Sequence, residues 1–264
     1  MEMLEYEFMQ RAFIAGIIIA ILASVSGSFI VLKRYSMLSE TLAHSALVGV
    51  SVGIVAGFSP MIAAVFVALV SAWLIEYLRS SFDIYSDAIM AIFLSASLAI
   101  AITIISLAGE FNSSIFSYLF GSILSVTTED VTTIFIFALV ALFILALFYR
   151  EFCFIAFDED VASTSGVKVK FLNYLLVTIV AIVIALSIRV VGSLLIGALM
   201  VIPTVAALQF KKSFALTVLY ATIFSILSVI VGMSLSYHFS LPSGATIVLA
   251  ILVIFILSLV VNRK

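Results

Sequence analysis

Near its start the chain reads Ala12-Phe-Ile-Ala-Gly-Ile-Ile-Ile-Ala-Ile-Leu-Ala-Ser-Val-Ser-Gly-Ser-Phe-Ile-Val-Leu32, a run of 21 residues without a charged side chain. A helix needs about 20 apolar residues to cross the hydrocarbon core of a bilayer, because backbone polar groups cannot be left unpaired in lipid. The run also lacks the alternation of polar and apolar residues that is typical of barrel strands. It therefore predicts a transmembrane helix.

The composition of the whole chain agrees with a membrane protein. Of 264 residues, 65% are hydrophobic and only 12 are basic and 14 acidic, whereas a soluble domain has roughly 25% charged residues. The 23 phenylalanines exclude a solvated, disordered chain. A net charge of −2 and the absence of long basic runs argue against nucleic-acid binding. The single cysteine excludes an internal disulfide.

Further uncharged runs extend the prediction to an all-α, polytopic transmembrane helical bundle. They lie at about 42–58, 61–75, 88–109, 131–149, 171–188, 190–210, 214–237 and 245–261. Hydropathy alone thus gives nine spans, and eight is the alternative. The apolar stretch at 115–125 is too short to cross a bilayer, which favours a re-entrant or interfacial segment. We expect one transmembrane domain over 1–264.

The positions of the basic residues predict the orientation. With nine spans and a re-entrant 115–125, ten of the twelve fall on one side: Lys33, Arg34, Arg79, Arg150, Lys168, Lys170, Lys211, Lys212, Arg263 and Lys264. By the excess of Lys and Arg in cytoplasmic loops, that side is the cytoplasm. The N-terminus is then outside and the C-terminus inside.

Glu40 and His44 are the ionisable residues that lie deepest in a predicted span. They are four residues apart, so they share one face of a helix. A carboxylate and an imidazole can ligate a divalent first-row metal through oxygen and nitrogen, but two ligands do not complete a site. The rest would come from another helix, from water or from a second copy in a dimer. A hydrogen bond between two buried polar groups, with no ligand, is the alternative.

Small residues follow the same helix at a spacing of four, which permits close helix contact. They are Thr41, Ser45, Gly49, Gly53 and Gly57. We therefore expect the pair formed by Glu40 and His44 to face the interior of the bundle.

Other polar residues suggest less. His238 is expected to be solvated at the outer surface, and Glu76 and Arg189 are expected to snorkel from span ends to the interface. Pro203 removes one helical hydrogen bond and is expected to kink or break the span at 190–210. No phosphate-binding G-x-x-x-x-G-K-[ST] loop occurs, so the chain is not expected to be an enzyme that hydrolyses nucleotide.

The string Gly27-Ser-Phe-Ile-Val-Leu-Lys-Arg-Tyr-Ser-Met-Leu-Ser-Glu-Thr-Leu-Ala-His-Ser-Ala-Leu-Val-Gly49 resembles the signature of the membrane permeases of metal-ion ABC importers, the zinc, manganese and iron uptake family. Three further stretches agree, in order along the chain: Tyr118–Asp130, Phe157–Lys168 and Val191–Ala206. The Tyr118–Asp130 stretch looks most like the zinc-type members.

The resemblance implies a homodimeric permease in a prokaryotic plasma membrane, with an ATP-binding cassette subunit beneath each copy and an extracytoplasmic metal-binding protein above. A divalent metal, zinc before manganese or iron, is then the substrate and no cofactor is expected. Glu40 and His44 match the family's metal-coordinating positions, although the family usually has Asp at the first. Some zinc-type members have histidine where this chain has Ser95.

The resemblance also marks a coupling helix, which would insert into a groove of the ATPase, in the cytoplasmic segment at about 155–167. The matching residues are Phe157, Asp158, Glu159, Asp160, Ala162 and Gly166. The three acidic residues favour a helix N-terminus and Gly166 a C-terminal stop.

Two other transport functions are alternatives. An ABC permease for a chelated metal or cobalamin would need a wide apolar path, which suits a deep Glu and His pair less well than a naked ion. A proton-coupled secondary transporter could use the pair as a relay, but such carriers often show two similar halves, and no repeat is evident here.

Overall fold

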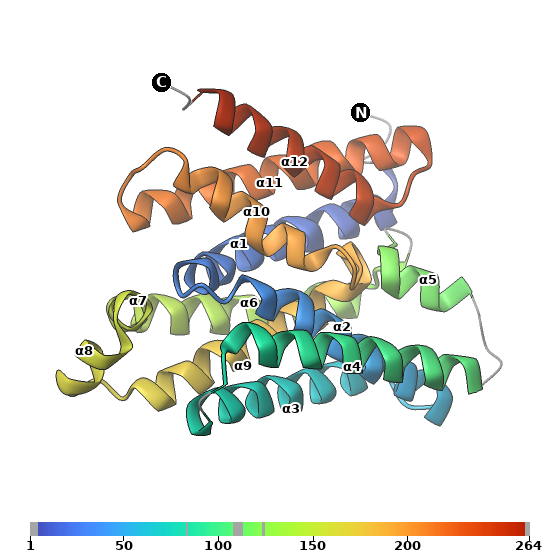
Figure 1. Cartoon of the computed structure of the whole chain (residues 1–264). Helices are drawn as coiled ribbons and strands as arrows, with labels where there is room; N and C mark the ends of the chain where they lie inside the picture. Colours follow the sequence, from blue (N-terminus) through green and yellow to red (C-terminus); the bar gives the residue numbers. More distant parts are fainter. Residues whose placement is uncertain (1–4, 83, 108–112, 123–124, 262–264) are drawn as a thin grey trace.

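A computed structural model describes residues 5–82, 84–107, 113–122 and 125–261 (Figure 1). Twelve α-helices and no strand occur in these ranges. The helices are α1 (Glu7–Leu32), α2 (Ser36–Ala56), α3 (Pro60–Ser81), α4 (Ser86–Leu107), α5 (Ser113–Phe120), α6 (Thr128–Leu147), α7 (Tyr149–Phe157), α8 (Glu159–Thr164), α9 (Val169–Val191), α10 (Ile196–Leu208), α11 (Phe214–Phe239) and α12 (Ser243–Val261). The expected all-α fold is confirmed.

Eight of the helices in the described ranges are long and apolar enough to cross a membrane, namely α1, α2, α3, α4, α6, α9, α11 and α12. About two-thirds or more of the most apolar part of α1, α2 and α9 is buried, but less than a third of the other five. The centre of the bundle is therefore built on α1, α2 and α9, and the outer helices turn apolar side chains outward. The protein is an integral membrane protein.

The hydropathy run at 190–210 is not a spanning helix of its own. Helix α9 continues to Val191, and the helical conformation is interrupted at Gly192. Helix α10 then has only 13 residues, or about 20 Å of helix. Gly192 has a φ of 92°, a conformation that side chains with a Cβ rarely adopt. Pro203 lies inside α10 without ending it, so the break expected at Pro203 is at Gly192 instead.

The short helix α10 still belongs to a segment that connects the two ends of the bundle (Figure 1). At one end, the N–H of Ser193 donates to the carbonyl of Tyr118 in α5. At the other end, the Phe214 ring at the start of α11 packs 5.3 Å from the Phe29 ring near the end of α1. The chain thus passes along the bundle a ninth time, through α10 and the non-helical residues on either side of it.

Helix α5 has eight residues and does not cross the bundle, as expected for 115–125, of which 123–124 lie outside the described residues. Its end packs against the break after α9: the N–H of Ser122 donates to the Arg189 carbonyl and the N–H of Leu194 to the Leu119 carbonyl. We call this end of the bundle the α5 end. The opposite end carries Lys33 and α8, and we call it the basic end.

The predicted small-residue stripe makes close helix contacts. The Thr41 hydroxyl donates to the Met90 carbonyl of α4 at 3.2 Å, and the Ser45 and Ser97 hydroxyls are 2.9 Å apart. A Cβ added to Gly49 would lie 2.4 Å from the carbonyl oxygen of Ala63 in α3. These contacts hold α2 between α3 and α4.

Glu76 and Arg189, the two residues expected to snorkel to the interface, are each in an ion pair. Glu76 is only 1% exposed and pairs with Arg79 at 2.6 Å, so the expectation is wrong for Glu76. Arg189 pairs with Asp130 but is partly exposed in the last turn of α9, so its snorkelling stays a prediction. His238 is exposed, as expected.

We predict that Gly49→Ala destabilises the protein. The added methyl group meets the backbone of α3, so the helices must separate, and overpacking of this kind costs typically 1–3 kcal/mol. Gly57→Ala is the matched control: the glycine has a φ of 71° but open space around it, so only backbone strain of about 1 kcal/mol is expected. Thermal unfolding of the detergent-solubilised protein measures both. Equal midpoints for the two variants would contradict the close contact.

Candidate functional site

Helix α2 carries the two predicted site residues. It begins at Ser36, after the turn that follows α1, and ends at Gly57 in a left-handed conformation. Glu40 and His44 are therefore in its first three turns. His44 is 6% exposed, whereas Glu40 is exposed on the surface of the chain.

The expectation that both side chains face the interior is thus right for His44 and wrong for Glu40. Helix α10 packs on the backbone of α2 beside Glu40 but does not cover its side chain. A Cβ added to Gly197 would lie 3.4 Å from the Glu40 nitrogen, an ordinary van der Waals contact. The Glu40 side chain remains exposed.

Neither side chain has a hydrogen-bond partner among the described residues. The Nδ1 atom of His44 is buried and unpaired, and no hydrogen bond joins His44 to Glu40, although the carboxylate is near enough to act on the imidazole electrostatically. An unsatisfied buried polar group costs about 1–3 kcal/mol. The alternative in which the pair is a closed, buried hydrogen bond is therefore wrong.

The two residues can offer a metal one carboxylate and one imidazole. In the part of the chain that the structure describes, no group of three or more His, Cys, Asp and Glu side chains could hold a metal ion. Ser95, at the position where some zinc-type members have histidine, is exposed on α4. One chain therefore presents an incomplete ligand set.

The segment at 155–167 contains the end of α7 and the short helix α8. Asp158 caps it by accepting hydrogen bonds from the backbone N–H groups of Asp160 and Val161, both at 3.0 Å. Gly166 ends the turn that follows, with a φ of 87°. The helix termini are where the acidic residues and the glycine predict them.

The residues of this segment point in different directions. Ala162 is fully buried, whereas Phe157 is 73% exposed and Asp160 is exposed. Glu159 is half-buried and pairs with Lys33 and Arg79. One side of the segment is therefore attached to the bundle and the other side is exposed. A role of this segment in coupling to an ATPase stays a prediction.

Sequence reasoning missed the partners of Glu159. Lys33 and Arg79 indicated only orientation, and Asn173, which donates to the Glu159 carboxylate at 3.1 Å, gave no signal at all. The distances in sequence between these residues carry no pattern, so only the folded chain brings them together.

Fold and site together define the class of the protein. A bundle of eight long apolar helices, with an unpaired carboxylate and imidazole on a central helix, is typical of a membrane transport protein. The model of the ABC 3 transport family matches residues 5–262. The chain belongs to this family, and it is a permease, the membrane component of an ABC transport system.

Relatives of known sequence cover nearly the whole chain. A "Probable metal transport system membrane protein" of Treponema pallidum is 37% identical, over 96% of this chain and 96% of the relative. The "Manganese transport system membrane protein MntC" of Listeria monocytogenes is 31% identical, over 99% and 93%. The "High-affinity zinc uptake system membrane protein ZnuB" of Haemophilus influenzae is 29% identical, over 96% and 97%.

A solved structure has the same arrangement of helices. A chain of "PsaBC from Streptococcus pneumoniae in complex with Fab" matches with a TM-score of 0.87 and 28% sequence identity, over 97% of this chain and 92% of that chain.

We predict that His44→Met leaves the stability of the permease unchanged or raises it. The imidazole nitrogen has no partner to lose, and methionine fills a similar volume without a buried unpaired polar atom. Ser45→Ala, one residue along the same helix, should instead lower the free energy of unfolding by about 0.5–1.5 kcal/mol, because it removes the bond to Ser97. Thermal unfolding in detergent tests both. A large loss of stability in His44→Met would mean that the histidine is structural.

Proposed function

We propose that the protein is the permease of an ATP-driven importer of a divalent first-row metal ion. The observation that carries this proposal is the Glu40 and His44 pair, which lies on a central helix and has no hydrogen-bond partner in the described chain. Ionisable groups at membrane depth are costly and by default functional. The metal named for the relatives supports metal as the cargo.

The pair would engage the ion in passing. Transport needs a site that binds strongly enough for entry and weakly enough for release, and one carboxylate with one imidazole meets that need. The ion is cargo and not a resident cofactor.

We propose a second copy of the chain as the source of further ligands. A carboxylate exposed on an apolar bundle would be unfavourable against lipid, so the surface around Glu40 is best covered by protein. In a homodimer with a two-fold axis near Glu40, each copy would contribute the same pair, since such interfaces use the same patch on both subunits.

We propose manganese or zinc as the metal, from the names of the relatives. The relatives named for manganese and zinc are 31% and 29% identical to this chain, so zinc, which the sequence favoured, has no advantage over manganese. Oxygen and nitrogen ligands are compatible with both ions.

The basic end is proposed to be cytoplasmic, with the N-terminus outside and the C-terminus inside, because an excess of Lys and Arg marks cytoplasmic loops. An ATP-binding cassette subunit would dock there against the exposed side of α8 and the end of α7, where Phe157 is exposed. A metal-binding protein would deliver the ion at the α5 end. The membrane would be a prokaryotic plasma membrane.

We predict that Glu40→Gln and His44→Ala each reduce metal uptake at least tenfold, because each removes one of the two ligands from every copy. Uptake of Mn²⁺ and Zn²⁺ is measured in proteoliposomes that contain the permease with its ATP-binding subunit. Glu129→Gln and His238→Gln serve as matched controls, since both residues are exposed near helix ends away from α2, and should transport normally.

Two results would contradict the proposal. Unchanged uptake in both site variants would remove the site, and uptake driven by a proton gradient without the ATP-binding subunit would indicate a secondary transporter, with the pair acting as a proton relay.

A further inference from the structure

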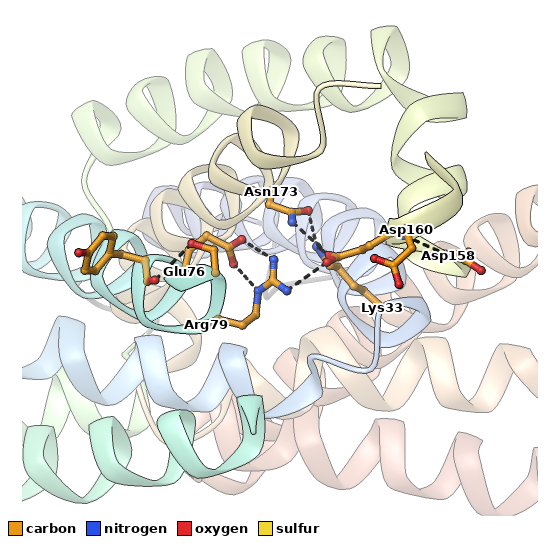
Figure 2. A network of polar contacts seen from close by, with 9 residues as sticks. Lys33, Glu76, Arg79, Asp158, Asp160 and Asn173 are labelled. Carbon is orange, nitrogen blue, oxygen red and sulfur yellow. Dashed lines mark hydrogen bonds and ion pairs between the residues drawn. The ribbon is translucent and has the colours of Figure 1, made fainter. Parts of the chain in front are cut away.

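A network of charged side chains at the basic end joins four helical segments (Figure 2). Glu159, the first residue of α8, lies at its centre. One carboxylate oxygen is 2.7 Å from the Lys33 ammonium and the other is 3.1 Å from the Arg79 guanidinium. Asn173 of α9 contacts both Glu159 and Lys33. A single carboxylate therefore holds groups from α1, α3 and α9 together.

The network continues into α3, and several of its side chains are largely shielded from solvent. Arg79 also binds Glu76 through two nitrogens, at 2.6 and 3.0 Å. The Lys33 side chain is 6% exposed and that of Glu76 2%. Burial alone would raise the pKa of Glu159, but the neighbouring Lys33 and Arg79 more than offset it and hold that pKa below its ordinary value. Glu159 is thus ionised at neutral pH.

The same network holds the turn that leads into α2. Lys33 caps α1, and Arg34 has a φ of 62°, in the left-handed region. The ring of Tyr35 lies 5.0 Å from the Lys33 nitrogen and 5.4 Å from the Arg79 guanidinium carbon. Helix α2 begins at the next residue, and Glu40 is about 6 Å further along it. The start of the helix with the proposed metal ligands is therefore fixed by these cations.

We infer that Glu159 is a positioning residue of transport, which ties α8 to the turn between α1 and α2. A displacement of α8 would pull on Lys33 and Arg79 and so move α2 with Glu40 and His44. This inference rests on the proposed function, in which the ATP-binding subunit docks on α8. The carboxylate contacts neither the metal nor the nucleotide, and it acts through α2.

The test measures metal ions transported per ATP hydrolysed, in proteoliposomes with the permease and its ATP-binding subunit. Glu159→Gln keeps the size of the side chain but removes the charge that both cations need, so the ratio should fall at least fivefold. Lys33→Met should give a similar fall. Because both variants break one linkage, the double variant should be no worse than either single variant.

Asn173→Ala provides a milder variant in case the charge-altering ones do not fold. It removes the amide that contacts Glu159 and Lys33 without changing any charge, and the ratio should fall two- to threefold. Glu151→Gln is the matched control, because this acid on α7 forms no ion pair among the described residues, and its ratio should equal that of the wild type.

Two further measurements separate this inference from the proposed function. Equilibrium binding of Mn²⁺ or Zn²⁺ to the purified permease should stay within twofold of the wild type in Glu159→Gln, and the variant should still co-purify with the ATP-binding subunit. A ratio within twofold of the wild type in Glu159→Gln and Asn173→Ala would overturn the inference, as would loss of co-purification. A wild type that neither binds nor transports metal would overturn the proposed function instead.

Discussion

The structure depends on the free-energy cost of removing charge from water. Six ionisable groups within or beside the long helices meet this cost by pairing: Glu76 with Arg79, Arg189 with Asp130, and Lys33 with Glu159. Breaking a buried pair by removing one partner typically costs 3–5 kcal/mol, so each of these pairs fixes how two segments meet. Glu40 and His44 are an exception, since no hydrogen bond or ion pair satisfies them in the described chain. The unpaired groups on α2 therefore differ from the paired charges that join other segments.

Packing between the central helices follows from small side chains rather than from hydrophobicity. Lipid is as apolar as leucine, so transmembrane helices associate through close contact and hydrogen bonds. On α2 the hydroxyls of Thr41 and Ser45 bond to α4, and Gly49 lies against the backbone of α3. The same stripe turns the neighbouring face, with His44, toward the inside. The stripe is therefore also what orients the proposed site.

The sequence was sufficient to predict the fold class, because an apolar run long enough to cross a bilayer has few stable conformations other than a helix. It also located the stripe on α2, the short α5 and the caps of α8, each of which depends on local residue type. It overestimated the span at 190–210, because hydropathy does not detect the break that Gly192 permits between two equally apolar segments. It placed Glu76 at the interface and Glu40 in the interior, because burial depends on which distant helix lies opposite. Helical spacing puts Glu40 and His44 on one face, but it does not say that the fold buries His44 and leaves Glu40 exposed.

The positions of the open pair and of the paired charges fit one another. A helix is stiff over a few turns, so α2 moves as a rod when its first residue moves. The network around Glu159 contacts the turn just before that first residue, and the proposed metal ligands lie in the first three turns after it. Ion pairs are suited to this position because their strength depends steeply on distance in a poorly solvated setting, so a small shift of α8 changes the forces on Lys33 and Arg79. A ligand pair at the far end of α2 would be held mainly by its contacts with α3 and α4. At the near end, the Glu40 and His44 pair would follow a displacement of α8. A subunit that docks on α8 would therefore act on the pair most effectively there.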